Sequence, residues 1–122
     1  MSKIVLWVSD LDAQINFYSN LLDAKVGVRN EGFAELSSSD NCVLLHELPV
    51  QYRVDLPLTE SLPAQDEVAI KPVFSVDDLE TARARVNGSL ASFPRDVLAH
   101  GNAKYLDVVD PEGNVIQLEQ SV

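Results

Sequence analysis

One order of apolar and polar residues occurs twice along this chain. An offset of 68 residues superposes the apolar run that starts at Lys3 on the run that starts at Lys71. An offset of 72 residues superposes Phe33-Ala34-Glu35-Leu36 on Tyr105-Leu106-Asp107-Val108. A common strand-to-helix cap could explain the first match, but not both matches in the same order. We therefore predict one structural module that is used twice.

The first module, residues 1–50, is predicted to have the element order βαβββ. Residues 3–9 are apolar and rich in β-branched and aromatic types, which indicates a buried strand. A helix is predicted over 11–22 from apolar residues at helical spacing, with either Ser9 or Asp10 as its N-cap. Three short apolar runs follow and predict three strands, at 24–30, 32–39 and 41–48.

The second module, residues 67–122, repeats this order after a linker at 51–66. The linker segment is rich in proline and lacks sustained periodicity, and we expect only a short edge strand near Tyr52 to Val54. The module itself is predicted to contain an apolar strand, a helix and three further strands, at 67–76, 77–86, 90–94, 103–109 and 115–120. The last two strands flank Asp110-Pro111-Glu112-Gly113-Asn114, where proline presets φ and glycine supplies a positive φ, as in a β-hairpin turn.

Composition limits the classes of partner. The chain has 122 residues, is 46% apolar and carries a formal net charge of −10, so we expect one domain with a real core and no nucleic-acid or anionic-membrane partner. No run of eighteen apolar residues and no signal-peptide pattern occur, which predicts a cytoplasmic location. The single cysteine, Cys42, is expected to be a buried and inert thiol.

The paired modules resemble the vicinal oxygen chelate superfamily, which includes glyoxalase I, bleomycin-resistance proteins, fosfomycin-resistance enzymes and extradiol dioxygenases. The resemblance rests on the V-[SD]-D-L-[DE] opening of each module and on the closing DPEGN turn, and it covers nearly all of residues 1–122 except the linker. It implies a single α+β domain in which two βαβββ modules form an incomplete, barrel-like curved sheet around a cavity, with the helices outside.

Period-two alternation sorts the strand side chains between the two faces of such a sheet. The apolar strength of Ile4, Leu6 and Val8 favours the helix side for these residues. The cavity side is then expected to receive Lys3, Val5 and Trp7 in the first module, and Lys71, Val73 and Ser75 in the second.

The superfamily usually holds a divalent metal with His and Glu side chains at inward positions. By the resemblance, Lys3 and Lys71 stand at two histidine positions and Gln117 stands at a glutamate position. The fourth position is Leu45 if the 72-residue offset continues, or His46 if the first module has one extra residue; burial favours an inward His46. Because a protonated ammonium group cannot ligate a metal, we expect no metal cofactor, with a divalent metal as the alternative.

Two alternatives stay open for the lysines. If Lys3 and Lys71 point inward, they could bind a carboxylate or pair with an acid such as Glu119. If they point outward, they are ordinary solvated residues near frayed strand ends, and this second interpretation is the favoured one.

Five residues form the candidate ligand-binding set of the expected cavity: Trp7, His46, His100, Tyr105 and Gln117. Aromatic and hydrogen-bonding side chains of this kind suit a small organic molecule. Each also has a structural alternative: core or dimer interface for Trp7, a strand-end histidine for His46, an exposed loop residue for His100, a cross-strand partner for Tyr105, and a backbone hydrogen bond for Gln117.

The resemblance therefore implies a small-molecule binding or sequestering protein of the bleomycin-resistance-like, antibiotic-resistance type. We expect a homodimer without a catalytic metal, and the acidic charge would suit a cationic ligand. One alternative is a metal-dependent lyase, isomerase or dioxygenase that uses His46, Gln117 and His100. Another is an interaction module whose cavity is filled by its own side chains.

Overall fold

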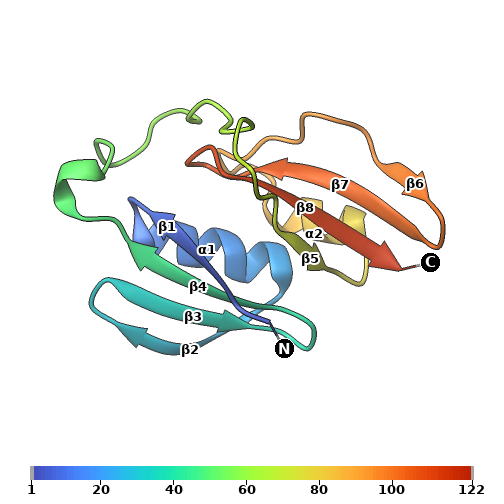
Figure 1. Ribbon diagram of the computed structural model, residues 1–122, viewed down its shortest axis with the longest axis horizontal. Coiled ribbons are helices and arrows are strands. Elements are labelled where there is room, and N and C mark those ends of the chain that lie inside the picture. Colours follow the sequence, from blue (N-terminus) through green and yellow to red (C-terminus); the bar gives the residue numbers. More distant parts are fainter. Residues whose placement is uncertain (1, 122) are drawn as a thin grey trace. The chain divides into compact units, whose positions relative to one another are not determined.

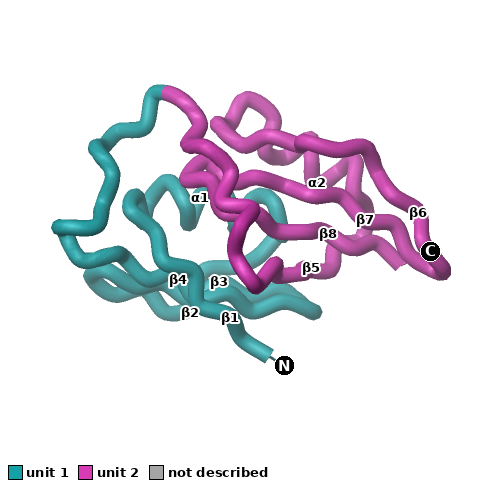
Figure 2. The backbone as a smooth tube through the Cα atoms, turned by 45° about the horizontal axis from the view of Figure 1, so that its top comes forward, with its two compact units in different colours: residues 1–59 teal, residues 60–122 magenta. Residues whose placement is uncertain are grey.

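The elements of the computed structural model, which describes residues 2–121, follow the same order twice (Figure 1). Residues 1–59 form one unit and residues 60–122 a second (Figure 2), so the division lies within the segment 51–66. Unit 1 contains β1 (Ile4–Val8), α1 (Leu11–Leu22), β2 (Lys25–Asn30), β3 (Phe33–Ser37), β4 (Cys42–Glu47) and the 3₁₀ helix η1 (Val50–Tyr52). Unit 2 contains β5 (Val73–Ser75), α2 (Leu79–Arg85), β6 (Leu98–His100), β7 (Ala103–Val109) and β8 (Val115–Ser121).

Each unit has one four-stranded mixed sheet, in the order β1-β4-β3-β2 in unit 1 and β5-β8-β7-β6 in unit 2. The first strand of each unit pairs in parallel with the last, and the other neighbours pair antiparallel. The two sheets therefore have the same topology, which confirms the predicted α+β fold built from two βαβββ modules.

In unit 1, α1 packs on β3 and β4 and covers one face of the sheet (Figure 1). The helix begins at Asp10, whose carboxylate accepts a hydrogen bond from the Ala13 amide at 3.1 Å, so Asp10 is the N-cap of the two candidates. The core between helix and sheet consists of apolar residues at alternate strand positions, among them Val8, Leu36, Val43 and Leu45, all fully buried.

In unit 2, α2 packs on β8 and begins at Asp78, whose carboxylate accepts from the Thr81 amide at 2.9 Å. The helix is shorter than the predicted 77–86. Its buried residues Leu79 and Ala82 belong to a core that also contains Phe74, Leu106, Val108, Ile116 and Leu118.

Three predicted strands differ from the structure. The edge strand expected near Tyr52 to Val54 is wrong, because the chain forms η1 there and the Tyr52 amide donates to the Pro49 carbonyl at 2.9 Å. The strand predicted at 67–76 is limited to β5, which begins directly after Pro72, a residue without an amide to donate.

The strand predicted at 90–94 is also wrong. Ser92 forms only a single bridge, in which its amide and carbonyl both bond Val109 at 2.9 Å, and Pro94 follows two residues later. The third strand of the module is instead β6, further along the chain. As a result His100, expected in a loop, lies at the end of a strand, and the turn follows it at Gly101.

Candidate functional site

One face of the unit 1 sheet is not covered by α1, and several of its side chains are exposed. Trp7 has 53% and Val5 has 46% of its surface exposed, whereas Val8 and Leu45 on the helix side are fully buried. His46 is exposed as well, so the structure decides between the two alternatives for this strand: His46 lies on the open face and Leu45 in the core.

Three aromatic rings meet on this open face. Trp7 and His46 are register partners in the parallel pairing of β1 with β4, and their ring centroids lie 4.6 Å apart with a 55° tilt. Phe33 is the register partner of His46 across β3 and β4, and its ring lies edge-on at 6.2 Å. We call Trp7, His46 and Phe33 the aromatic cluster; the imidazole occupies the middle of it.

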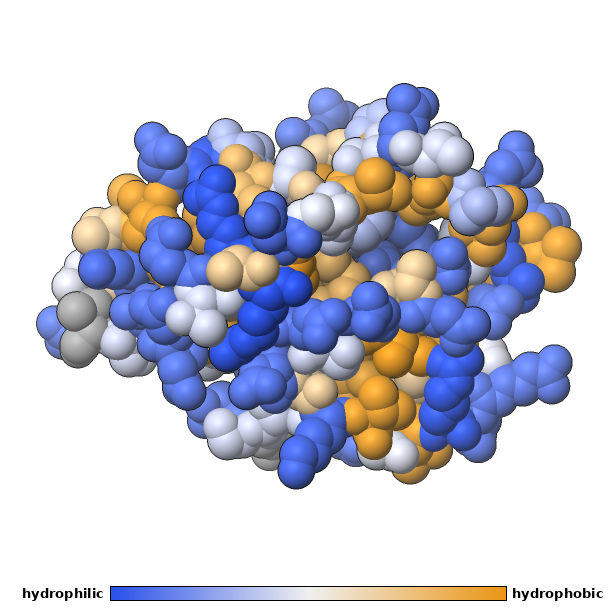
Figure 3. Space-filling view, turned by 180° about the vertical axis from the view of Figure 1, so that it is seen from behind, coloured by the Kyte–Doolittle hydropathy of each residue, from blue (hydrophilic) through white to orange (hydrophobic). Residues whose placement is uncertain are grey.

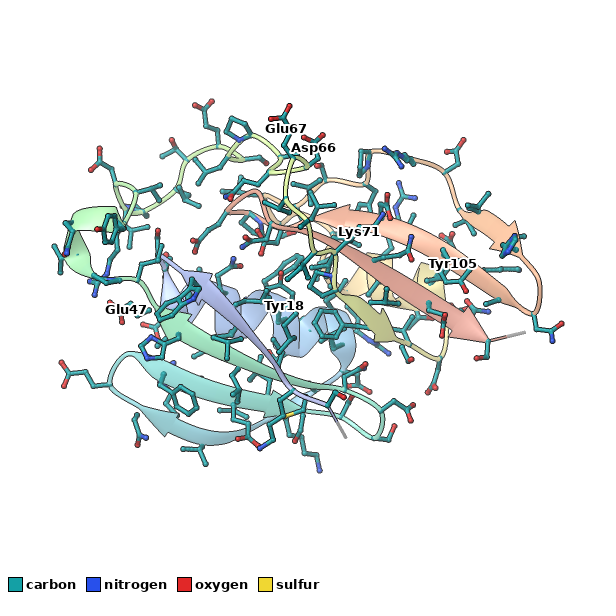
Figure 4. All side chains as sticks on the ribbon, in the orientation of Figure 1. Tyr18, Glu47, Asp66, Glu67, Lys71 and Tyr105 are labelled. Atoms are coloured by element: carbon teal, nitrogen blue, oxygen red, sulfur yellow. The ribbon has the colours of Figure 1, made fainter. Side chains whose placement is uncertain are left out.

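The central residue of the aromatic cluster, His46, is held by polar and charged contacts at the end of β4. The His46 Nδ1 lies 3.1 Å from the Glu47 carbonyl oxygen, and Glu47, labelled in Figure 4, pairs with Arg53 at 2.8 Å. Arg53 also donates from Nε to the Leu48 carbonyl at 2.6 Å. These contacts fix the chain just after His46 and therefore restrict the position of the ring.

Lys3 lies on the same open face and pairs with Glu35, at 3.8 Å between Nζ and Oε2. Glu35 also accepts a weak hydrogen bond from the thiol of Cys42, which is buried as expected. Of the two alternatives for this lysine, the structure therefore supports pairing, but the acid is Glu35 and not Glu119.

In unit 2 the corresponding face carries a network around one buried carboxylate. Asp107, which is 8% exposed, accepts from Lys71 Nζ at 3.3 and 3.5 Å and from Gln117 Nε2 at 3.0 Å. Arg95 approaches the same carboxylate, with 3.4 Å between its guanidinium and Oδ2. We call Asp107, Lys71, Arg95 and Gln117 the Asp107 cluster. The favoured sequence interpretation, a solvated Lys71, is corrected by this pairing.

Tyr105 also lies in unit 2 (Figure 4), as the register partner of Glu119 across β7 and β8. A hydrogen bond with the Glu119 carboxylate raises the pKa of the Tyr105 phenol above its ordinary value, and desolvation and the negative charge of Glu119 add to this effect. Tyr105 thus has the cross-strand contact that was its structural alternative. His100 is exposed at the end of β6, where its register partner on β7 is Ala103.

Three residues of the two clusters were missed by the sequence analysis: Arg95, which no sequence signal indicated, and Phe33 and Asp107. Phe33 and Asp107 belong to the four-residue match at an offset of 72 residues, in which Phe33 aligns with Tyr105 and Asp107 with Glu35. The repeat was therefore the available signal, since it placed an aromatic and an acidic residue at equivalent positions of both sheets.

Two of the three assigned ligand positions, Lys3 and Lys71, do not fit a divalent metal, and the third, Gln117, offers only a neutral carbonyl oxygen. Lys3 and Lys71 present ammonium groups to carboxylates, and Gln117 uses its amide nitrogen to donate to Asp107. Within the part of the chain that the structure describes, no group of three or more His, Cys, Asp or Glu residues is placed to hold a metal ion. That part also contains no helix long and apolar enough to span a membrane.

Comparison with known proteins gives one family and many similar folds. The model of the Glyoxalase/Bleomycin resistance protein/Dioxygenase superfamily matches residues 1–118. A search of curated proteins finds no match. The fosfomycin resistance protein FosX from Mesorhizobium loti is 16% identical, with 100% of this chain and 92% of that chain covered and a TM-score of 0.67.

Two further solved structures are similar over the whole of this chain. A glyoxalase family protein from Bacillus cereus is 17% identical, with 93% of that chain covered and a TM-score of 0.74. FosX from Listeria monocytogenes, in complex with Mn(II) and a sulfate ion, is 16% identical, with 90% of that chain covered and a TM-score of 0.67. At these identities the similarity concerns the fold, whereas the family model matches the sequence itself. The chain therefore belongs to the Glyoxalase/Bleomycin resistance protein/Dioxygenase superfamily.

Proposed function

We propose that this protein binds and sequesters a small organic molecule without a catalytic metal. The observation that carries the proposal is the state of the three assigned ligand positions. Lys3 is paired with Glu35, while Lys71 and Gln117 both donate to Asp107. The two ammonium groups have no lone pair to offer a cation, and Gln117, whose Nε2 donates to Asp107, could offer only its neutral carbonyl oxygen, so these positions support binding rather than metal chemistry.

The aromatic cluster is the proposed binding surface. Trp7 is large and half exposed, His46 supplies a ring nitrogen for hydrogen bonding, and Phe33 extends the apolar area beside it. Ligand sites typically combine apolar and aromatic contact area with a few polar groups of this kind. The net charge of −10 favours a cationic aromatic ligand, which an exposed indole also attracts through its ring face.

Several parts of this proposal go beyond the family membership. We propose that His100, Tyr105 and Gln117 contribute further ligand contacts, that the protein acts as a homodimer, and that it works in the cytoplasm. The structurally similar fosfomycin resistance proteins support an antibiotic as one class of ligand to test, alongside bleomycin-type compounds.

Intrinsic fluorescence gives a direct test, because Trp7 is the only tryptophan of the chain. Titration with bleomycin-type and other cationic aromatic compounds, and separately with the anionic phosphonate fosfomycin, is expected to quench or shift this fluorescence saturably for at least one of them, with heat in calorimetry and a raised Tm. Trp7→Leu should weaken that binding by calorimetry at least tenfold.

The matched control is Tyr52→Leu, since Tyr52 is another exposed aromatic residue of unit 1, at 69%, outside the aromatic cluster. It should leave the affinity unchanged. If no compound produces heat, a change in fluorescence or a shift in Tm, the ligand class is wrong. Elemental analysis of freshly purified protein tests whether the protein works without a catalytic metal. Stoichiometric Ni, Zn, Mn or Fe would favour a metal-dependent lyase, isomerase or dioxygenase instead.

A further inference from the structure

The Asp107 cluster combines two cations with one carboxylate. Lys71 and Arg95 both approach Asp107, at 3.3 and 3.4 Å, and Gln117 adds a neutral amide. In the part of the chain described by the structure, neither cation forms an ion pair with another acid. One positive charge is therefore left over at this point of a protein whose net charge is −10.

Exposure of the three charged side chains differs sharply. The Asp107 side chain is 9% exposed, whereas those of Lys71 and Arg95 are 41% and 76% exposed. The carboxylate thus lies beneath the cations, and a solute approaching the open face of the unit 2 sheet meets the ammonium and guanidinium groups. A lysine offers three donors and an arginine five, so donors remain free after the contacts with Asp107.

Neither neighbouring position on β8 forms an ion pair with the two cations among the residues that the structure describes. Gln117 is held by its own bond to Asp107 and carries no charge. Glu119, two residues further along β8, keeps its negative charge, but its carboxylate is directed to the Tyr105 phenol, from which it accepts a hydrogen bond. The geometry points to an oxyanion-binding site formed by Lys71 and Arg95, with Asp107 and Gln117 as positioning residues.

The ligand group of this site is a carboxylate or a phosphate-like oxyanion. A guanidinium binds either one through two parallel N–H···O bonds, and an ammonium adds a point charge beside them. Asp107 holds both cations in place before the anion arrives, which lowers the entropy lost on binding. This inference goes beyond the proposed function, because it rests on the unit 2 cluster and not on Trp7.

Unit 1 provides an internal comparison. Its equivalent pair, Lys3 with Glu35, is longer at 3.8 Å, and the acid is 29% exposed. Within residues 2–121, Glu35 pairs with this one cation, so the pair is neutral. A lysine paired with one acid, as in unit 1, is therefore not expected to bind an anion. The unit 2 cluster is expected to bind one because it has a second cation, Arg95.

The test is an NMR titration of the full ¹⁵N-labelled chain with inorganic phosphate, and separately with acetate, at constant ionic strength set with NaCl. We expect saturable shifts confined to the amides and side chains around Lys71, Arg95, β7 and β8. Arg95→Gln should weaken the affinity at least tenfold, and Lys3→Met should leave it unchanged.

Arg95→Gln is the main variant because it leaves the Lys71–Asp107 pair intact, so loss of folding cannot explain its effect. Lys71→Met is the second variant, and its affinity is interpreted only if its NMR spectrum stays dispersed, as expected for a folded chain. Saturable binding of phosphate, of acetate or of both supports the site and selects the anion class. Shifts that do not saturate, or that are the same in Arg95→Gln, would overturn it. Either of these results would leave the Trp7 fluorescence test of the proposed function unaffected.

Discussion

Single residues explain why the two modules have diverged chemically on the same frame. Glu35 and Asp107 occupy equivalent positions of the repeat, and each forms an ion pair with the lysine that precedes the first strand of its unit. The unit 2 version is more buried and recruits Arg95 and Gln117 as well. A buried carboxylate requires such partners, because an uncompensated one is costly. The sequence repeat thus extends to a repeated ion pair.

Tyr105 provides a prediction about pKa. Its phenol has a raised pKa relative to the ordinary value of 10.0, first through the hydrogen bond with Glu119. Because the folded pKa is above the unfolded one, this contribution to stability is present at and below the unfolded pKa and is lost as the pH rises through the folded value. Glu119→Gln should therefore lower the pKa of Tyr105 towards its ordinary value.

Ultraviolet difference titration of tyrosinate measures this change, with Tyr105→Phe identifying which of the tyrosines is responsible. Glu80→Gln, at the first turn of α2, is the control and should not move the curve. An unchanged Tyr105 titration in Glu119→Gln would show that the cross-strand hydrogen bond is not formed in solution.

Asp78 provides a second prediction at this scale. The Thr81 side-chain hydroxyl and then its backbone amide donate to this N-cap carboxylate, which lowers the pKa of Asp78 below the ordinary value of 3.8. A lowered folded pKa means that the cap stabilises the protein above the unfolded pKa and that this stabilisation is lost as the pH falls through the folded value. Asp78→Asn keeps an oxygen for capping but does not titrate.

The free energy of unfolding of both proteins, measured by denaturant at neutral pH and near pH 3, checks this expectation about Asp78. The wild type should be the more stable at neutral pH, and the difference should shrink in acid. A difference that stays constant with pH would contradict a titrating cap.

At the scale of elements, the turn between β7 and β8 does more than reverse the chain. The buried carboxylate of Asp110 accepts from the amides of Glu112 and Asn114, both at 2.9 Å. Gly113 has φ 89°, and its carbonyl accepts from the Gln65 amide at 2.8 Å. The turn therefore binds the segment before β5 as well as closing the hairpin.

Gly113→Ala tests this contact. An added Cβ would lie 2.3 Å from the Pro63 carbonyl oxygen, closer than real Cβ atoms come to backbone. The control is Gly88→Ala, because Gly88 has a similar φ of 87° but nothing within 4 Å of the added atom. Both variants lose the glycine's freedom at positive φ, and Gly113→Ala should cost about 1–3 kcal/mol more through overpacking.

Chemical denaturation of the two glycine variants gives these free energies of unfolding. Equal losses in both would mean that the segment around Pro63 does not rest on the turn. A larger loss in Gly88→Ala would be a still stronger contradiction.

The helices and most strands could be predicted from the sequence, because their causes are local. Asp78 caps the helix that follows it directly, and the alternation of side chains along β1 places Trp7 and Val8 on opposite faces of the sheet. The strand predicted at 90–94 failed because pairing partners decide which of two short apolar runs joins a sheet edge. Ser92 meets Val109 in only one bridge, whereas β6 pairs with β7 over three residues. Such a choice depends on residues distant in the sequence.

At the scale of the whole molecule, charge is the dominant property. The net charge is −10, and hydrophilic side chains occupy much of the face seen in Figure 3, with apolar ones between them. Excess charge of one sign destabilises a folded chain by self-repulsion, which salt screens. Raising NaCl from about 0.01 M to about 0.15 M should therefore raise the Tm.

Calorimetry or circular dichroism at both salt concentrations measures this shift, and choline chloride serves as a control for effects specific to sodium. A fall in Tm would mean that attractive pairs such as Arg29 with Asp12, at 2.5 Å, outweigh the general repulsion. Exposed pairs are worth little individually, so we expect the repulsion to prevail.

The sequence by itself determined the repeated βαβββ order, the capped starts of the helices and the alternation of buried and exposed residues along the first strand. These follow from periodicity, turn residues and side-chain type, all of which act over a few neighbours. Only the tertiary structure decided that His46 lies between Trp7 and Phe33, and that Lys71 meets Asp107 36 positions later. The physical reason is that contacts across a sheet depend on strand register, which the whole set of pairings fixes together.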